Sequence, residues 1–340
     1  MVQRSLIAFA VLSALVATPA LAEKDEKRKP PPLAEEPGWD FTINLNAGVG
    51  RSTSQFNPEN ENAVTKDLNN SGTTTTKGVV FPLLRAAYTQ QDLKTQWFLG
   101  NSLDNVSRGE FQLEAGVTRE FDSGTRATFA LFPDLPFFGE TWADPYLIDE
   151  AREKTDVKNQ GGRIALDFIW GLPINLKYGF ANTEVKKEIS GQSQGITRSQ
   201  QDLLVRDGNF HRVTLEGFVP LSKNLRLTPS LFYTRGDLKG KAMASKEFGG
   251  RFAMNYNRNR HFLTANISYS QTSYDASNPV FMQEQKDKKL GVFALYAYKE
   301  PFGWKDFSMN LIVAWSDTRS NIVFYESDVF AGAVGLTYRF

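Results

Sequence analysis

The chain has 340 residues, with 39 basic and 38 acidic side chains, two histidines and no cysteine. This near-neutral charge excludes the strong basic excess expected of a nucleic-acid-binding protein. The lack of cysteine excludes a disulfide framework, a thiolate metal site and a cysteine nucleophile. Aromatic residues make up 13% of a chain whose mean hydropathy is only −0.37, a combination compatible with strands that alternate apolar and polar side chains.

The first 38 residues predict an export signal followed by an unstructured tail. Arg4 precedes an apolar run from Leu6 to Val16, and Ala20-Leu21-Ala22 has the small residues of a cleavage site. We therefore interpret residues 1–22 as a signal peptide, because the apolar run is well short of the ~20 residues that a membrane-spanning helix needs. Residues 23–38 are charged and proline-rich, which predicts a disordered periplasmic tail.

Residues 39–340 predict an all-β, antiparallel, transmembrane β-barrel. Segments of about ten residues alternate apolar with small or polar side chains, the period of two that a strand with one lipid-facing side requires. Clear examples are 41–47, 111–117, 164–170, 174–180, 213–219, 263–269 and 307–315. Short connections alternate with long ones, as expected where periplasmic turns alternate with extracellular loops.

The number of segments predicts fourteen strands, with both chain ends on the periplasmic side. The short connections are 90–93, 121–124, 171–173, 220–223, 257–260 and 299–305. The long connections are 50–78, 101–109, 133–161, 182–209, 236–246, 271–287 and 317–328. A barrel of twelve strands remains an alternative, because Pro82 removes a backbone hydrogen-bond donor and the segment 94–100 is short.

Setting the apolar positions toward lipid predicts which charged side chains face the lumen. Seven basic and three acidic residues away from the strand ends point inward: Arg85, Arg126, Arg163, Lys177, Arg212, Arg226 and Arg251, with Glu114, Asp167 and Glu216. Charges on the wall of a pore set the sign of its ion selectivity, so an open barrel should prefer anions. The alternative, that arginines and carboxylates cross-link the lumen and hold it shut, stays open.

The long connection 133–161 is the candidate constriction loop. It is unusually apolar for an extracellular segment, and the residues of interest are Phe138, Glu140, Trp142, Asp144 and Tyr146. Because a large exposed apolar surface is unfavourable in water, we expect this loop to be buried. Folding into the barrel mouth and packing against neighbouring loops or lipopolysaccharide are both compatible with the sequence.

The end of the chain is typical of the last strand of an outer-membrane barrel. From Phe330 to Phe340 one face is mostly apolar and ends in Tyr338 and Phe340. We interpret these two aromatics as the signal that the barrel assembly machinery recognises. The predicted location is therefore the outer membrane, in contact with membrane lipid and lipopolysaccharide.

Catalytic motifs are weak in this sequence. Outer-membrane hydrolases use a histidine as general base, and the two histidines, His211 and His261, are predicted at opposite rims of the barrel. Asp202, Asp207 and Asn209 lie near His211 in sequence, but a rim histidine is the favoured interpretation. The sequence contains no Gly-x-Ser-x-Gly, His-Glu-x-x-His or glycine-rich phosphate motif, so no cofactor or metal is expected.

The chain also resembles the bacterial outer-membrane proteins catalogued as domain of unknown function 2860. The resemblance covers residues 38–340 and is carried by Phe98–Asn105, Gly139–Leu147, Ala151-Arg152, Thr155-Asp156 and the barrel-type C-terminus. It implies an exported barrel of unknown activity. It gives no catalytic or binding residue.

The sequence favours a passive, porin-like pore for small polar solutes, with a preference for anions. The alternative is a closed barrel with a structural or ligand-binding role through the loops 50–78, 133–161 and 182–209. A hydrolase that uses His211 at the outer rim is the least favoured hypothesis.

Overall fold

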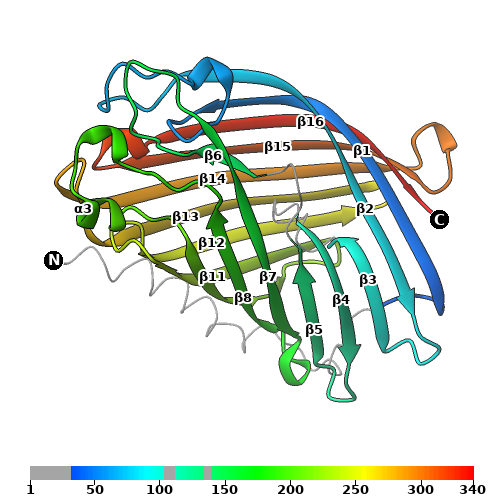
Figure 1. Cartoon of the computed structure of the whole chain (residues 1–340). Coiled ribbons are helices and arrows are strands. Elements are labelled where there is room, and N and C mark those ends of the chain that lie inside the picture. Colours follow the sequence, from blue (N-terminus) through cyan, green and yellow to red (C-terminus); the bar gives the residue numbers. More distant parts are fainter. Residues whose placement is uncertain (1–31, 103–111, 134–138) are drawn as a thin grey trace.

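The computed structural model describes residues 32–102, 112–133 and 139–340, which form a closed antiparallel β-barrel of fourteen wall strands (Figure 1). The predicted signal peptide, most of the predicted tail and Phe138 lie outside the described residues. In the described part of the chain, no helix has the length and apolar character needed to cross a membrane.

The wall strands run in chain order around the barrel. They are β1 (Gly38–Thr53), β2 (Thr74–Thr89), β3 (Thr95–Asn101), β4 (Leu113–Glu120), β5 (Arg126–Phe132), β7 (Lys154–Asp167), β8 (Ile174–Val185), β9 (Gly208–Gly217), β11 (Leu225–Leu238), β12 (Ser245–Arg258), β13 (His261–Asn278), β14 (Gln283–Lys299), β15 (Phe307–Ser320) and β16 (Ser327–Arg339). Two short strands, β6 (Glu140–Trp142) and β10 (Val219–Pro220), pair with β7 and β11. The helical segments are η2 (Asn60–Asn62), η3 (Ile169–Gly171), η4 (Gln192–Gln194), α3 (Arg198–Asp202), η5 (Pro301–Gly303) and η6 (Val323–Tyr325).

The pairing of β2 with β3 excludes the twelve-strand alternative. Residues 85–89 of β2 pair with residues 96–100 of β3, and β3 pairs in turn with β4. Pro82 costs no ladder bond, because Leu84 directs its N–H toward β3, where it donates to the side chain of Asn101. Residues two positions apart in a strand direct their N–H groups to the same side, so the nitrogen of Pro82 is also on the side of β3. The pairing of β2 with β3 begins only at Arg85, so no strand partner lies opposite Pro82 on that side.

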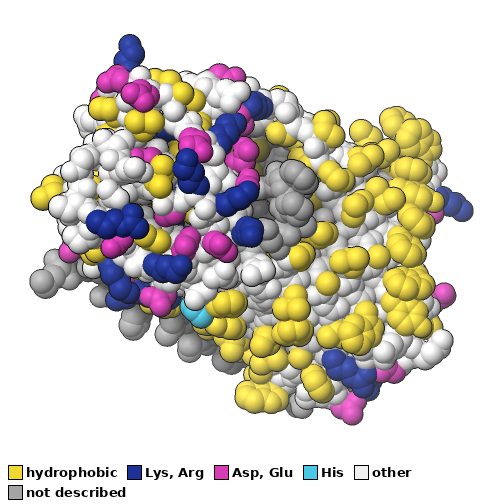
Figure 2. Space-filling view, viewed as in Figure 1, with side chains coloured by type: hydrophobic (Ala, Val, Ile, Leu, Met, Phe, Trp, Pro, Cys, Tyr) yellow, Lys and Arg dark blue, Asp and Glu magenta, His cyan; other side chains and the backbone are white. Residues whose placement is uncertain are grey.

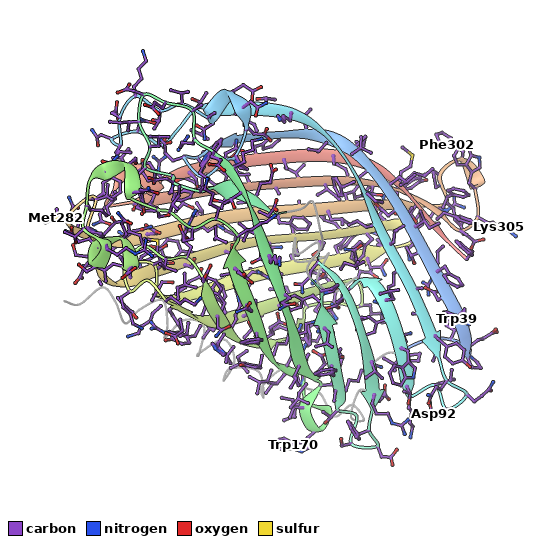
Figure 3. All side chains as sticks on the ribbon, viewed as in Figure 1. Trp39, Asp92, Trp170, Met282, Phe302 and Lys305 are labelled. Atoms are coloured by element: carbon purple, nitrogen blue, oxygen red, sulfur yellow. The ribbon has the colours of Figure 1, made fainter. Side chains whose placement is uncertain are left out.

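The outward face of the wall carries an apolar belt. Belt side chains on strands all around the barrel are exposed, among them Leu45, Leu131, Ile267, Leu311 and Val334. Figure 2 shows hydrophobic side chains over the strands and most of the charged ones over the loop end. Figure 3 places Trp39, Trp170 and Phe302 at the short-turn end and Met282 at the loop end. Such a surface is unfavourable in water and fits a bilayer, so the strands are built to span a membrane.

Several strands extend further than the alternating pattern predicts. The predicted loop 271–287 is mostly strand, since β13 continues to Asn278 and β14 begins at Gln283. The predicted loop 133–161 contains β6 and the first residues of β7. Beyond the belt both faces of a strand are polar, so the apolar period of two ends while the backbone ladder continues.

Charge should be tolerated on one face of a strand and not on the other. Ile267 is half exposed in the belt, and Ser268, its neighbour in β13, faces the lumen beside Gly291. We expect Ile267→Lys to lower the free energy of unfolding by about 2 to 4 kcal/mol and Ser268→Lys to change it little. The measurement is urea unfolding in lipid vesicles, followed by tryptophan fluorescence. Equal losses for the two variants would contradict the assigned strand phase.

The barrel closes where β1 meets β16. Their register runs from Thr42 opposite Arg339 to Thr53 opposite Asp328. On the inner face Asn310 of β15 reaches past β16, where its amide donates to Asn46 at 2.7 Å, and Asn44 donates back to Asn310 at 2.9 Å. This polar contact ties three strands together at the seam.

Candidate functional site

All ten charged residues predicted for the lumen lie on wall strands, at positions that alternate with the belt. They are Arg85 on β2, Glu114 on β4, Arg126 on β5, Arg163 and Asp167 on β7, Lys177 on β8, Arg212 and Glu216 on β9, Arg226 on β11 and Arg251 on β12. The basic residues thus come from β2, β5 and the strands from β7 to β12. Away from the strand ends, the inner face of β13, β15, β16 and β1 carries instead uncharged polar residues such as Thr264, Asn266, Asn310 and Asn46.

The ion pairs in the lumen run along the wall. Arg163 makes two hydrogen bonds to the fully buried carboxylate of Glu114, at 2.7 and 2.8 Å. Between them lies β5, whose inward residue at this level is the small, fully buried Ala130. Lys177 and Glu216 form a second pair at 3.0 Å between β8 and β9. These pairs join strands that are adjacent or one apart, and they do not bridge opposite walls.

Four lumen arginines lie over phenylalanine rings. The distances from guanidinium carbon to ring centroid are 4.6 Å for Arg85 over Phe98, 5.8 Å for Arg126 over Phe168, 3.9 Å for Arg212 over Phe232 and 4.8 Å for Arg226 over Phe218. Contacts of this kind hold a planar cation in place without neutralising its charge.

The lumen carboxylates outside the predicted set include Glu120 and Glu247. Glu120 binds Arg126 at 2.7 Å, and Glu247 accepts a hydrogen bond from Thr234 and approaches Arg212 to 3.9 Å. Both are at or near strand ends, where the prediction made no assignment. Extending the same alternation along β4 and β12 would have found them. They reduce the basic excess among these residues from four (seven minus three) to two (seven minus five).

A cavity of about 410 Å³ lies in the lumen against β7, β8, β9, β11 and β12, here called the lumen cavity. It brings together five of the ten predicted residues: Arg163, Lys177, Arg212, Glu216 and Arg251. Arg85, Glu114, Arg126, Asp167 and Arg226 are not in its lining. Four phenylalanines belong to the same lining, Phe180 and the inward-facing Phe132, Phe210 and Phe232.

Glycines in neighbouring strands leave the space that the rings of Phe132, Phe210 and Phe232 occupy. A Cβ atom at Gly161 would lie 2.6 Å from the ring of Phe132, and one at Gly236 would lie 2.8 Å from the ring of Phe210. Gly249 stands in the same relation to Phe232. Because a methyl group at these positions would displace the ring, the absence of a side chain lets each ring lie close to the wall.

Apolar side chains from six outer connections meet over the loop end of the barrel in a cluster here called the loop cap. Its members include Phe56 from 54–73, Tyr146 from 139–153, Leu204 from 186–207, Met243 from 239–244, Phe281 from 279–282 and Phe324 from 321–326. Tyr146, Leu204 and Phe324 are almost completely buried. These connections start from strands all around the circumference, so the loop cap extends across the mouth.

The loop cap contains the buried Tyr146 and the partly buried Tyr325. The hydroxyl groups of Tyr146 and Tyr325 are 2.7 Å apart, and Asn278 donates to Tyr325 at 2.7 Å. Burial raises the pKa of both tyrosines above the ordinary value, so both remain neutral at physiological pH.

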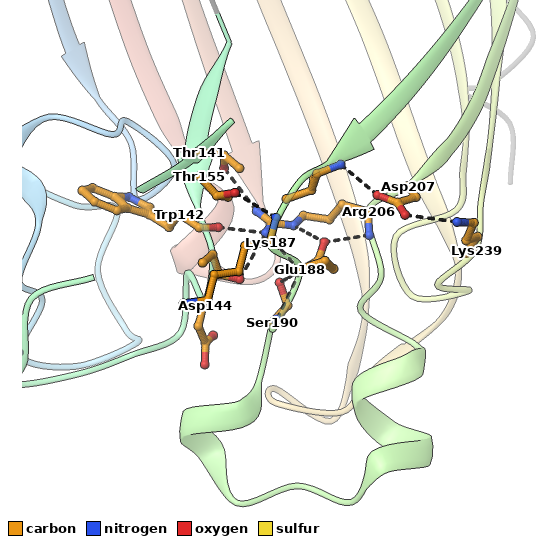
Figure 4. A network of polar contacts seen from close by, with 12 residues as sticks. Thr141, Trp142, Asp144, Thr155, Lys187, Glu188, Ser190, Arg206, Asp207 and Lys239 are labelled. Carbon is orange, nitrogen blue, oxygen red and sulfur yellow. Dashed lines mark hydrogen bonds and ion pairs between the residues drawn. The ribbon is translucent and has the colours of Figure 1, made fainter. Parts of the chain in front are cut away.

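Ion pairs and hydrogen bonds fasten the segment 139–153 to its neighbour 186–207 (Figure 4). Arg206 binds Glu188 through two nitrogens, at 2.8 and 3.0 Å, and donates to the backbone oxygen of Trp142 at 2.8 Å. In return Asp144 accepts backbone N–H groups from Gly191 and Ser193, both at 2.9 Å.

Arg152 fastens the same segment to the first outer connection. It is 4% exposed and donates to the backbone oxygen and side chain of Gln55, and to the backbone oxygens of Asn62, Ala63 and Pro145. Its guanidinium also lies 4.7 Å from the ring centre of Trp142. Burial lowers the pKa of Arg152 to about 10, so it remains charged at neutral pH and needs all of these acceptors.

The candidate constriction loop is therefore packed against neighbouring loops, one of the two arrangements that the sequence allowed. Trp142, Asp144 and Tyr146 are buried there, whereas Glu140 in β6 is exposed and pairs with Lys154.

The histidines lie on the outer surface of the barrel. His211 contacts the hydroxyl of Tyr178 at 2.8 Å on the belt side of β8 and β9, and His261 makes the same contact with Tyr296 near the short-turn end. Asp202, Asp207 and Asn209 bind Arg198, Lys239 and Asn182 respectively. Across the described residues there is no group of histidine and carboxylate side chains able to hold a metal ion.

A closed antiparallel barrel with an apolar outer belt and a charged lumen defines the class of outer-membrane β-barrels. Within that class, the chain belongs to the family described as a protein of unknown function (DUF2860), whose profile matches residues 38–339. The resemblance seen in the sequence is thereby confirmed. No curated protein matches the chain.

Several solved structures have a similar fold. The CymD monoaromatic hydrocarbon channel is 9% identical, with a TM-score of 0.47, and the match covers 90% of this chain and 89% of that one. An anion-selective porin from Comamonas acidovorans is 12% identical, with a TM-score of 0.42, and the match covers 90% of this chain and 100% of that one. The outer membrane channel DcaP of Acinetobacter baumannii is 10% identical, with a TM-score of 0.43, and the match covers 89% of this chain and 98% of that one. At these identities the likeness is one of barrel fold.

Proposed function

We propose that this protein is a passive outer-membrane channel for small polar solutes, with a preference for anions. The observation that carries the proposal is the course of the lumen ion pairs. Arg163–Glu114 and Lys177–Glu216 follow the wall, whereas a lumen held shut would need bridges between opposite walls. The basic residues on the strands from β7 to β12 supply the anion preference.

The loop cap favours a second candidate function, a closed barrel with a structural or ligand-binding role at the cell surface. Six connections share one buried apolar cluster over the mouth, and such a surface is costly to expose. Single-channel recording in a planar bilayer separates the two functions. Stepwise conductance supports the channel, and silence at all voltages supports the closed barrel.

The remaining parts of the proposal follow from the class of protein. The expected location is the outer membrane, where the belt meets lipid and the outer rim meets lipopolysaccharide, and the expected assembly partner of β16 is the barrel assembly machinery. No nucleic acid, cofactor or catalytic activity is part of the proposal. His211 faces away from the lumen, which makes the hydrolase hypothesis the least favoured.

Selectivity tests the role of the lumen charges. Arg212→Glu combined with Arg226→Glu changes the wall by four charge units and leaves the buried pair of Arg163 and Glu114 intact. We expect the reversal potential in a salt gradient to shift toward cation preference. The shift should be largest at about 0.01 M salt, where the screening length is about 30 Å.

A matched control reverses the same number of charges outside the lumen. Lys246 and Lys288 are exposed on the outer faces of β12 and β14, so the double variant with glutamate at both positions should leave the reversal potential unchanged. If the lumen variant conducts with unaltered selectivity, these arginines do not line the path.

A further inference from the structure

The chain reverses its direction just before the first wall strand. Gly38, Thr89 and Gln96 form one row across β1, β2 and β3, because Gly38 pairs with Thr89 and Thr89 pairs with Gln96. Five residues before Gly38, the backbone oxygen of Leu33 accepts a hydrogen bond from the side chain of Gln96 at 3.3 Å. A straight continuation of β1 would carry Leu33 about 16 Å beyond this row. The chain therefore folds back toward the level at which the strands begin.

The contact between Leu33 and Gln96 lies on the inner side of the wall. Gln96 alternates with the belt residue Trp97, which is 53% exposed, so the side chain of Gln96 points into the barrel. The same amide donates to the hydroxyl of Thr89 at 3.0 Å, and Thr89 is 2% exposed. Figure 3 places Trp39 and Asp92, at the starts of β1 and β3, at the short-turn end. Leu33 therefore lies inside the mouth of the barrel at that end.

Gly38 makes this reversal possible. Its φ angle is +128°, a value that residues with a side chain rarely adopt. No neighbouring atom lies within 4 Å of a Cβ built at this position, so the backbone conformation, and not the space, calls for glycine. The reversal is thus a feature of the backbone that a single substitution can oppose.

Residues 32–37, here called the mouth segment, are held lightly. Leu33 and Ala34 are partly buried, whereas Glu35 and Glu36 are exposed. The bond from Gln96 to Leu33 joins two uncharged groups, and such a bond contributes little net stability once its partners can bind water instead. The ladders of β1 and β2 do not depend on this bond, so the segment can leave the mouth while the barrel stays closed.

We propose that the mouth segment is a releasable constriction that narrows the lumen at its short-turn end, the periplasmic end in the proposed topology. The lumen would then have a narrow point at each end, since the loop cap covers the other. The inference rests on the proposed channel function only for its effect on conductance. The position of the segment and the access of reagents to the lumen are independent of it.

Cross-linking in the full-length protein tests the position of the mouth segment. The chain has no cysteine, so Leu33→Cys with Thr118→Cys gives a unique pair, and Thr118 of β4 is the strand neighbour of Gln96. A short bifunctional thiol reagent should join the two cysteines, as detected by mass spectrometry. Leu33→Cys with Val117→Cys is the matched control, because Val117 faces lipid, and it should not be joined. Absence of the first cross-link, or an equal yield in the control, would overturn the proposal.

Removal of the mouth segment should open the lumen at this end. Deletion of residues 23–37 should raise single-channel conductance. It should also accelerate severalfold the reaction of Thr42→Cys with a water-soluble maleimide, because Thr42 alternates with the belt residue Ile43 and faces the lumen from β1. Heat-dependent gel mobility shows that the deleted chain is folded.

Gly38→Ala should act in the same direction as the deletion, because alanine disfavours the φ angle of the reversal. It should lower the yield of the cross-link from Leu33→Cys to Thr118→Cys. Gly78→Ala is the matched control, since a Cβ at Gly78 also meets no atom within 4 Å and its φ angle is an ordinary one for a strand. Equal yields in the two variants would overturn the role of the reversal.

The two readouts keep the constriction and the channel distinguishable. Unchanged labelling of Thr42→Cys in the deleted chain overturns the constriction, whether or not the protein conducts. Faster labelling without conductance in either chain retains the constriction and overturns the channel in favour of the closed barrel. Faster labelling together with higher conductance supports both.

Discussion

Arg152→Ala is expected to loosen the loop cap and to increase single-channel conductance severalfold. The substitution removes the donor from the side-chain oxygen of Gln55 and from the backbone oxygens of Asn62 and Pro145, and it removes the cation from the ring of Trp142. Hydrogen bonds to a charged donor contribute about 1.5 to 3 kcal/mol each, so the cap should lose at least about 3 kcal/mol. Limited proteolysis within 139–153 should become faster in parallel.

Arg319→Ala provides the control at the same end of the barrel. Arg319 is 69% exposed and pairs with Asp317 and Glu326 at the surface, where such pairs contribute little. Its replacement should alter neither conductance nor proteolysis. Faster proteolysis of Arg152→Ala at unchanged conductance would mean that the loop cap does not limit permeation.

Deletion of Phe340 should prevent most of the protein from reaching the outer membrane as a folded barrel. The backbone of Phe340 exchanges two hydrogen bonds with Phe41, at 2.8 and 3.0 Å, and its ring stacks on Phe41 and Tyr338 at centroid distances of 5.3 Å. The deletion thus removes the final ladder contact of β16 and the middle of an aromatic row. Fractionation of cells, with heat-dependent gel mobility, measures the assembled fraction.

Phe340→Tyr separates the aromatic requirement from chain length. Tyrosine retains the backbone contacts and the ring, so assembly should stay near the wild-type level. Normal assembly of the deleted chain would show that the terminal aromatic is not needed for recognition or closure.

Alternation alone was enough to predict the strand count. The same alternation is the basis on which the lumen side chains were assigned. A residue two positions from a belt residue faces lipid and its neighbour faces the lumen, so Arg163 and Lys177 could be placed without knowledge of their partners. The identity of those partners could not be predicted from the alternation. Arg163 reaches Glu114 across β5, and this contact is possible only because the intervening residue, Ala130, is small.

The contacts within the loop cap could not be predicted from patterns in the sequence. Arg152 and Gln55 are separated by 97 positions, and nothing periodic links the two connections that contain them. The apolar character of 133–161 indicated burial, but its partners depend on which loops converge over the mouth. Charged residues near strand ends, such as Glu247, were missed because the strands continue past the last apolar position.

The seam between β1 and β16 makes the barrel an all-or-nothing structure. Asn44 and Asn310, which meet there, are 266 positions apart, so the contact forms only after nearly the whole chain is available. A chain that stops short of β16 would keep two unpaired strand edges, and such edges pair readily with other chains. Incomplete chains of this protein should therefore become substrates for periplasmic proteases or aggregates, and not smaller barrels.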